Sequence, residues 1–458
     1  MKKYYILAAA VVIFYFVQSF FLSAGGIGAD SLSYFGIAAD LPHPETNLFP
    51  LGFPISLKFF HLIFQDWFWA SKFLNFSLIV GILLFSYFKK FYLRETVLLF
   101  TGKTLFFVYT NVMSESFFIF LLYLMLYFFH QRFKNQLSSG KFLFWSSLLM
   151  ILMVATRYAG IYIFAGIGLF YFLILNKTVN YKKDMLKFLL ISGLGIFGYL
   201  LLNQITFGSF AGEDLRGKHA AILPIDVFRN FLGVTNVIDP FIGIKPASNS
   251  FASLAFQVLL MVLDFVLLYY IIKLFKKKKE TLQLHFHYLL YFIAGTYTVL
   301  LFVSGFFQQI EEMNIRMLAA ANFCLFFSFL IIYFTNLKND KIIFGLGCFF
   351  LIFLSLYNIK VPDNYLKNKK EIEMQMPKFS SKKYLYNNER GKVAVTEYKI
   401  PFTGKTIQYN HTSQQPGDVK LNIAGTINPK IKWIKKASLV QKKNVLYTSE
   451  LHLGSESH

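Results

Sequence analysis

The chain has 458 residues, of which 55% are hydrophobic, 19% aromatic and only 15% charged. A soluble domain carries about a quarter charged residues and fewer aromatic ones, so this composition excludes an ordinary soluble protein and favours lipid-facing helices. The net charge of +22 lies mostly in short loops between apolar runs and in the C-terminal tail. These basic residues therefore act as topology signals, and no nucleic-acid partner is predicted.

Apolar stretches long enough to cross a bilayer predict about eleven transmembrane helices. In chain order they lie near residues 4–23, 67–88, 95–110, 116–130, 142–156, 159–175, 187–205, 252–272, 286–304, 316–335 and 342–357. Lys2 and Lys3 in front of the first run also fit a signal peptide. The length of that run and the poor cleavage site before Gly25 favour a retained helix. The sequence thus predicts an all-α polytopic membrane domain over residues 1–357.

Basic residues occupy every second loop. They follow the second, fourth, sixth, eighth and tenth spans. In that order, the groups are Lys89, Lys90 and Arg94; Arg132, Lys134 and Lys141; Lys177, Lys182, Lys183 and Lys187; Lys276 to Lys279; and Lys338 with Lys341. Residues 24–50 and 110–115 contain no Lys or Arg. The positive-inside rule then predicts a cytoplasmic N-terminus, and an odd number of spans leaves residues 358–458 outside.

The segment 358–458 is polar and Lys-rich, and it forms a second predicted domain. Alternating polar and apolar residues at 392–396 and 419–423 favour a small β-rich fold. Its positive charge agrees with an outer location, because long domains cross membranes largely regardless of charge. It could be a solvated domain packed on the membrane part, a cap over a site, or a patch that meets anionic headgroups or glycans.

Two cysteines, Cys324 and Cys348, lie inside apolar segments, so neither a disulfide framework nor a thiolate metal site is expected. Ionisable residues on the predicted outer face come from five loops. They are Asp30, Asp40, His43, Glu45, Glu115, Arg157, Glu213, Asp214, Arg216, His219, Glu311, Glu312 and Arg316. Singly, such charges are commonly anchors at the membrane boundary. Together they predict a site that binds an anionic lipid headgroup beside a carboxylate.

Five short motifs lie in these outer loops. In chain order they are Gly28-Ala29-Asp30-Ser31-Leu32-Ser33-Tyr34; Phe49-Pro50-Leu51-Gly52-Phe53-Pro54; Met113-Ser114-Glu115; Thr156-Arg157-Tyr158-Ala159-Gly160; and Asn314-Ile315-Arg316-Met317-Leu318. Their order and shared location resemble the GT-C membrane glycosyltransferases, most closely the protein O-mannosyltransferase and aminoarabinose-transferase branch. The resemblance covers residues 1–357. It implies a GT-C-like architecture in a bacterial cytoplasmic membrane, with the C-terminal domain outside.

The resemblance implies transfer of a sugar from a polyprenyl-phosphate donor to a hydroxyl of a lipid, protein or glycan acceptor. Asp30 is the candidate general base, because the acceptor oxygen needs a carboxylate to take its proton. The departing lipid phosphate needs fixed cations, and a guanidinium offers a planar two-pronged geometry. Arg157 and Arg316 are therefore the candidate donor-phosphate ligands, with Lys72 as a further one.

Sugar or acceptor contacts are expected from Tyr34, His43, Glu45, Glu115 and Tyr158. For Glu115, the alternative is that it positions an arginine. Many relatives carry two adjacent acids in the first loop, whereas Ala29 and Ser31 flank Asp30 here. This departure weakens the case for a divalent metal without excluding one, and no other cofactor is predicted. Membrane lipids complete the expected partners.

Two other functions remain open. Lys103 and Asp264 fall near the middle of predicted spans, where charges often mark a transport path, so a lipid-linked sugar flippase or secondary transporter is one. Against it, the sequence shows no inverted repeat and no matching pair of broken helices. A Wzy-like polysaccharide polymerase is the other. It would be expected to use an arginine-rich outer loop, and residues 206–250 contain only Arg216 and Arg229 as arginines.

Overall fold

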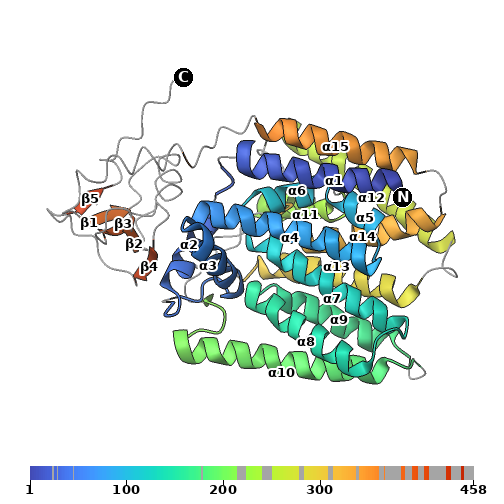
Figure 1. Cartoon of the computed structure of the whole chain (residues 1–458), viewed down its shortest axis with the longest axis horizontal. Coiled ribbons are helices and arrows are strands. Elements are labelled where there is room, and N and C mark those ends of the chain that lie inside the picture. The colour runs from blue at the N-terminus through green and yellow to red at the C-terminus, as the bar shows by residue number, and fades with distance from the viewer. Residues whose placement is uncertain are drawn as a thin grey trace. The chain divides into compact units, whose positions relative to one another are not determined.

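The computed structural model of the chain describes residues 1–22, 25–27, 29–44, 46–176, 179–213, 223–239, 250–277, 283–307, 313–336 and 340–359, with residue 366 and five strands beyond it (Figure 1). The chain divides into two compact units. The first unit comprises residues 1–15, 76–109 and 114–357, and the second comprises residues 16–75, 110–113 and 358–458. Residues 16–75 and 110–113 thus belong to the same unit as the C-terminal segment.

Most described residues are helical. The helices are α1 (Lys2–Val17), the π-helical turn η1 (Gln18–Leu22), α2 (Ala29–Asp40), α3 (Gly52–Phe64), α4 (Trp67–Lys89), α5 (Leu93–Leu99), α6 (Lys103–Thr110), α7 (Ser114–Phe133), α8 (Ser139–Thr156), α9 (Gly160–Ile174), α10 (Lys182–Phe207), α11 (Pro224–Val234), the short helix η3 (Thr235–Val237), α12 (Phe251–Lys277), α13 (Leu284–Ser304), α14 (Ala319–Asn336) and α15 (Lys341–Ile359).

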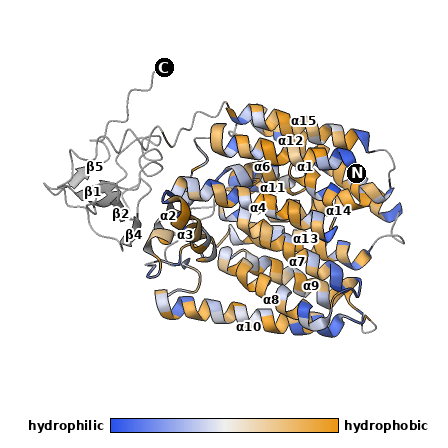
Figure 2. Ribbon diagram, viewed as in Figure 1, coloured by the Kyte–Doolittle hydropathy of each residue, from blue (hydrophilic) through white to orange (hydrophobic). Residues whose placement is uncertain are grey.

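Within the described ranges, nine helices are long and apolar enough to cross a membrane, which makes the chain a polytopic helical membrane protein. They are α1 with its continuation to Phe21, α4, α7, α8, α10, α12, α13, α14 and α15. Figure 2 shows hydrophobic residues along the lengths of the long helices of the first unit and hydrophilic ones near many of their ends. The predicted span at 159–175 corresponds to α9, whose 15 residues fall below this length.

The predicted single span at 95–110 is wrong, because the structure has two short helices there, α5 and α6. The backbone makes a tight turn between them. The N–H of Thr101 donates to the Leu98 carbonyl and the N–H of Gly102 donates to the Leu99 carbonyl, each at 3.1 Å. The Thr101 hydroxyl also donates to the Leu98 carbonyl, and the Tyr15 hydroxyl donates to the Phe100 carbonyl at 2.9 Å. Side chains thus satisfy backbone groups that the interrupted helix releases, as an apolar environment requires.

Small residues let the helices of the first unit approach closely. A Cβ at Gly166 of α9 would lie 3.0 Å from the Cα of Ile293 in α13, which is tighter than ordinary contact. Glycine at this position therefore brings α9 against α13, as small residues commonly do in membrane bundles. This packing places α13 beside the turn that joins α8 to α9.

In the second unit, the 13 residues of α3 divide between a buried and an exposed side. The helix buries Phe53 and Leu57 but leaves Ile55, Phe59 and Leu62 exposed, the pattern of a helix with a lipid-facing side.

Five strands lie in the C-terminal segment, namely β1 (Lys383–Tyr386), β2 (Val395–Ile400), β3 (Ile407–His411), β4 (Lys430–Ile434) and β5 (Val445–Tyr447). They form one sheet in the order β4-β2-β3-β1-β5. The strand β2 pairs antiparallel with β3 and β4, whereas β1 pairs in parallel with β3 and β5.

Candidate functional site

Three of the residues predicted to form the site meet in the first unit. Glu115 lies in the first turn of α7, and its side chain is 5% exposed. The Nη1 atom of Arg157 lies 2.6 Å from the Oε2 atom of Glu115, and the Nε atom of Arg316 lies 3.5 Å from its Oε1 atom. Arg157 also donates to the Ser114 hydroxyl at 3.1 Å. Two guanidinium groups from distant parts of the sequence thus converge on one carboxylate.

Both guanidinium groups retain some contact with the exterior. The side chains of Arg157 and Arg316 are 19% and 16% exposed, against 5% for Glu115. The carboxylate is therefore more buried than the two cations that it contacts, and it can fix their orientation. At 2.6 Å the Arg157–Glu115 contact is a short charge-assisted one, which is stronger than a neutral hydrogen bond, whereas the 3.5 Å Arg316–Glu115 contact is a longer ion pair.

The tight turn after α8 presents Arg157. The residue has an extended backbone, with φ −149° and ψ 129°, while its N–H still donates to the Met153 carbonyl at 2.9 Å. The next helix begins at Gly160, where a Cβ would lie 2.9 Å from the backbone nitrogen of Val154. A larger residue would force the turn open, so glycine keeps the arginine in place.

Tyr158, predicted to contact sugar or acceptor, is anchored in the same turn. Its hydroxyl accepts a hydrogen bond from the Asn203 amide of α10 at 3.1 Å. The same amide donates to the Phe210 carbonyl at 2.9 Å, so Asn203 joins the turn to the segment after α10. Tyr297 of α13 is buried and also interacts with Arg157.

The segment before α14 presents Arg316. The side-chain oxygen of Asn314 accepts from the backbone N–H groups of Arg316 and Met317, at 3.0 and 3.2 Å. This local turn is a common role of Asn at a helix start. The helix α11 supports the segment, because Asn230 accepts from the Met313 N–H at 2.8 Å. A Cβ at Gly233 would lie only 2.3 Å from the Met313 carbonyl oxygen.

In the second unit, Lys72 fastens the first loop to the segment that precedes α7. Its side chain is fully buried, and its ammonium donates to the carbonyls of Gly25 and Thr110 at 2.9 and 2.8 Å. Gly26 has a φ of +80°, and a Cβ there would lie 2.9 Å from the Thr110 oxygen. These contacts favour a structural role for Lys72 over the predicted contact with a donor phosphate.

The same unit places Asp30 in the first turn of α2, half-buried. The neighbouring Ser31 hydroxyl donates to the Val112 carbonyl at 2.7 Å, and the Val112 N–H donates to the Gly26 carbonyl at 2.8 Å. The start of α2 is therefore attached to residues 110–113 by the same set of bonds that involves Lys72. A carboxylate held by a fixed backbone suits the predicted role of base.

Tyr34 and His43 have contrasting environments. Tyr34 is 2% exposed, and its ring centroid lies 4.8 Å from that of Phe49 and 5.0 Å from that of Phe53. Residues of the 49–54 motif therefore cover its ring. His43 is exposed. Several other candidates lie outside the described residues, namely Glu45, Asp214, Arg216, His219, Glu311 and Glu312.

Three contributors were missed at the sequence level. Ser114 stands beside Glu115 in the motif Met113-Ser114-Glu115, so adjacency was an available signal. Tyr297 and Asn203 lie within long apolar helices, and a single polar residue there predicts nothing by itself. Within the residues that the structure describes, His, Cys, Asp and Glu side chains do not gather in threes or more to form a metal site.

The arrangement can do two things chemically. In the first unit, the partly exposed guanidinium groups of Arg157 and Arg316 can bind an anionic group. In the second unit, considered by itself, the half-buried carboxylate of Asp30 can accept a proton. No protein-family model, curated protein or solved structure matches this chain.

Proposed function

We propose that this chain is a membrane glycosyltransferase that moves a sugar from a polyprenyl-phosphate donor to an acceptor hydroxyl on the extracytoplasmic face. The observation that carries the proposal is the convergence of Arg157 and Arg316 on the buried carboxylate of Glu115. The nine long apolar helices found in the described part of the chain add the membrane setting that a lipid-linked donor needs. The proposal includes a GT-C-like architecture, a cytoplasmic N-terminus and a bacterial cytoplasmic membrane.

The proposed reaction joins the acceptor oxygen to the anomeric carbon of the sugar. The bond between that carbon and the phosphate oxygen breaks, and the Asp30 carboxylate takes the acceptor proton. The lipid phosphate leaves with an additional negative charge, which Arg157 and Arg316 stabilise. Fixed donors of this kind act where charge develops, and loss of one typically costs about 10²–10³ in rate. Glu115 keeps both guanidinium groups oriented before the donor arrives.

The test is transfer by the purified protein. Labelled polyprenyl-phosphate sugars and a mixed acceptor pool should give a labelled glycoside, and Arg157→Lys should lower kcat/KM for the donor by about 10² because the ammonium cannot reproduce the two-pronged geometry. Arg132→Lys is the matched control, since Arg132 also pairs with a largely buried carboxylate, Asp184, at 2.6 Å but lies outside the cluster. Equal activity of both variants would exclude this role for Arg157.

A lipid-linked sugar transporter is the second candidate. Lys103 of α6 and Asp264 of α12 both interact electrostatically with Asp239, which follows η3 and is buried. Charges gathered among apolar helices are a common feature of transport paths. In sealed vesicles, a transporter would move the intact labelled donor across the bilayer without forming a glycoside. That outcome would replace the transferase proposal.

The polymerase alternative depends on the outer loop at 206–250. Residues 214–222 and 240–249 of this loop lie outside the described residues. The transfer assay separates this alternative too, because a polymerase would need a lipid-linked glycan as both donor and acceptor.

A further inference from the structure

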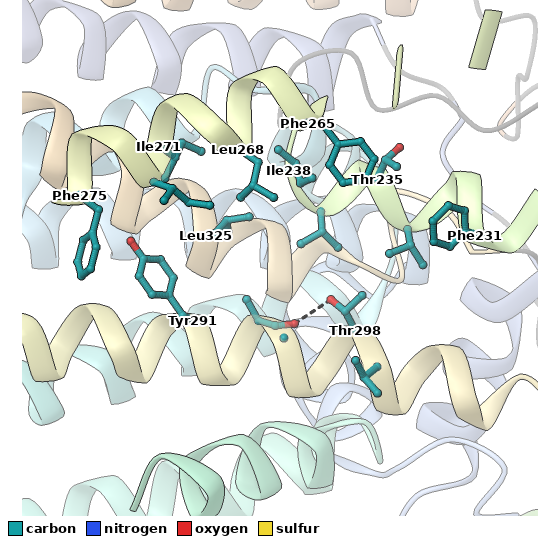
Figure 3. A pocket seen from close by; sticks show the side chains of 16 residues that line it. Phe231, Thr235, Ile238, Phe265, Leu268, Ile271, Phe275, Tyr291, Thr298 and Leu325 are labelled. Atoms are coloured by element: carbon teal, nitrogen blue, oxygen red, sulfur yellow. Dashed lines mark hydrogen bonds between the residues drawn. The ribbon is translucent and has the colours of Figure 1, made fainter. Parts of the chain in front are cut away.

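A groove runs between α12 and α13 in the first unit, and its volume is about 510 Å³. One wall carries Phe265, Leu268 and Phe275 from α12, and the other carries Tyr291 and Thr298 from α13. Figure 3 shows these side chains on the two facing helices, with Phe275 and Tyr291 at one end and Phe231 of α11 at the other.

The few polar groups in the walls are already satisfied. The hydroxyl of Thr298 donates to the Ala294 carbonyl at 2.8 Å, and that of Thr235 donates to the Leu232 carbonyl at 2.8 Å. The hydroxyl of Tyr291 accepts from Ser328 at 2.9 Å. A ligand in the groove therefore needs no polar group there, and hydrocarbon is the complement of these walls.

The helix α13 is recessed along the groove. Nothing lies within 4 Å of a Cβ placed on Gly295, and a second hollow of about 430 Å³ lies on its other side, also lined by Gly295, Tyr291 and Val299. An apolar cavity of about 150 Å³ in a soluble protein is large enough to take up benzene. This groove is more than three times as large and lies among lipid-facing helices, so it has room for a longer hydrocarbon ligand.

The length of the groove and the charges next to one of its ends indicate which kind of hydrocarbon chain it binds. Phe265 and Phe275 are ten residues apart on one helix, which corresponds to about 15 Å, or half of the roughly 30 Å hydrocarbon core of a bilayer. The groove thus matches the depth of one leaflet. Next to its Phe275 end, α12 finishes with the exposed Lys276 and Lys277, and Lys273 is also exposed.

We propose that this groove binds one acyl chain of an anionic phospholipid whose headgroup lies at the Lys276–Lys277 end of α12. The lysines attract the phosphate, as basic residues next to a transmembrane helix do with anionic lipids. The aromatic pair Phe275 and Tyr291, whose ring centroids are 5.6 Å apart, bounds the chain at that end. The proposal depends on the membrane setting and is independent of the glycosyltransferase proposal.

The test uses nanodiscs with equal amounts of phosphatidylglycerol and phosphatidylcholine of identical acyl chains, followed by mild detergent extraction and native mass spectrometry. The wild-type protein should retain one phosphatidylglycerol in preference to phosphatidylcholine. Gly295→Phe should fill the groove and lower retention about tenfold or more. Gly345→Phe is the matched control, because Gly345 is a helical glycine of α15 with equally open space around its Cβ. It should retain the lipid as the wild type does.

The headgroup is tested separately. Lys276→Gln and Lys277→Gln should each lower the preference for phosphatidylglycerol about fivefold while one acyl chain still binds. The proposal would be overturned by no lipid preference in the wild type, by undiminished retention in Gly295→Phe, or by preferential uptake of polyprenyl phosphate when it is added in competition. A dimer that Gly295→Phe abolishes would assign the groove to a second copy of the chain instead.

Discussion

The Nη1 atom of Arg157 lies 2.6 Å from the Oε2 atom of Glu115, so one ion pair joins the turn after α8 to the first turn of α7. Arg316 approaches the other oxygen of the same carboxylate. Glu115 is thus the common partner of two cations, and its removal should affect both.

Glu115→Gln should lower the free energy of unfolding by about 1–3 kcal/mol, because two guanidinium groups lose their charged acceptor while the side chain keeps its shape. Thermal unfolding in detergent measures the change. Glu213→Gln is the control: Glu213 is exposed and accepts from the backbone N–H groups of Phe210 and Ala211, and glutamine keeps one carbonyl oxygen as an acceptor, so the change should be below about 1 kcal/mol. An unchanged midpoint for Glu115→Gln would mean that the ion pairs contribute nothing to the fold.

Asn203→Ala should destabilise the turn that carries Tyr158. The substitution removes both hydrogen bonds of a buried amide, and the expected loss is about 1–3 kcal/mol. Gln204→Ala, at the next position, removes an exposed contact with the Gly208 carbonyl and should cost less than about 0.5 kcal/mol. Equal unfolding midpoints for the two variants would contradict the anchoring role of Asn203.

Lys72→Met separates the structural role of Lys72 from the predicted phosphate contact. Loss of the ammonium leaves the carbonyls of Gly25 and Thr110 without this donor, so the free energy of unfolding should fall by about 1–3 kcal/mol. Lys89→Met, at an exposed position, should have little effect. If Lys72 instead binds the donor, Lys72→Met would raise KM for the donor and leave the unfolding midpoint unchanged.

Asp340 should make stability depend on pH in the acidic range. A hydrogen bond from Lys3 holds the pKa of Asp340 below its usual value, and one from Tyr4 acts in the same direction. A depressed folded-state pKa gives stability that is fully present above the unfolded value of about 3.9 and is lost as pH falls through the folded value. Because the pair is partly exposed, the contribution should be below about 1 kcal/mol.

Unfolding of wild type and Asp340→Asn across this range checks the prediction. The difference between them should stay constant above about pH 5 and shrink below about pH 4. In a Lys3→Gln background the difference should be smaller throughout, since the main partner is gone. A difference that grows towards acid would reverse the sign of the argument.

The predicted orientation can be tested by labelling. His43 and Lys277 are both exposed, and the positive-inside rule places them on opposite faces of the membrane. With Cys324 and Cys348 replaced, an impermeant maleimide should label His43→Cys in intact cells and Lys277→Cys only after permeabilisation. Labelling of both in intact cells would contradict the topology.

The sequence was most informative where a physical rule applies to many residues at once. Hydropathy predicted most of the membrane helices. The expectation that polar residues on one face meet was met by Glu115, Arg157 and Arg316. The hydropathy prediction failed at 95–110. The hydrogen bond from Tyr15 to the Phe100 carbonyl is a tertiary contact, which hydropathy does not encode. For the same reason, the position of Lys72 near a helix end did not show that its ammonium would face two carbonyls.

Gly233 has a consequence for genetics. A Cβ at this position would lie so close to the Met313 carbonyl that any side chain would displace the segment leading to Arg316. A random-mutagenesis screen for loss of whatever Arg316 does should therefore recover alleles at codon 233, although that residue has no side chain to offer a ligand. Such alleles would be suppressed by changes that give the 313–318 segment room, and they would map a mechanical dependence instead of a chemical one.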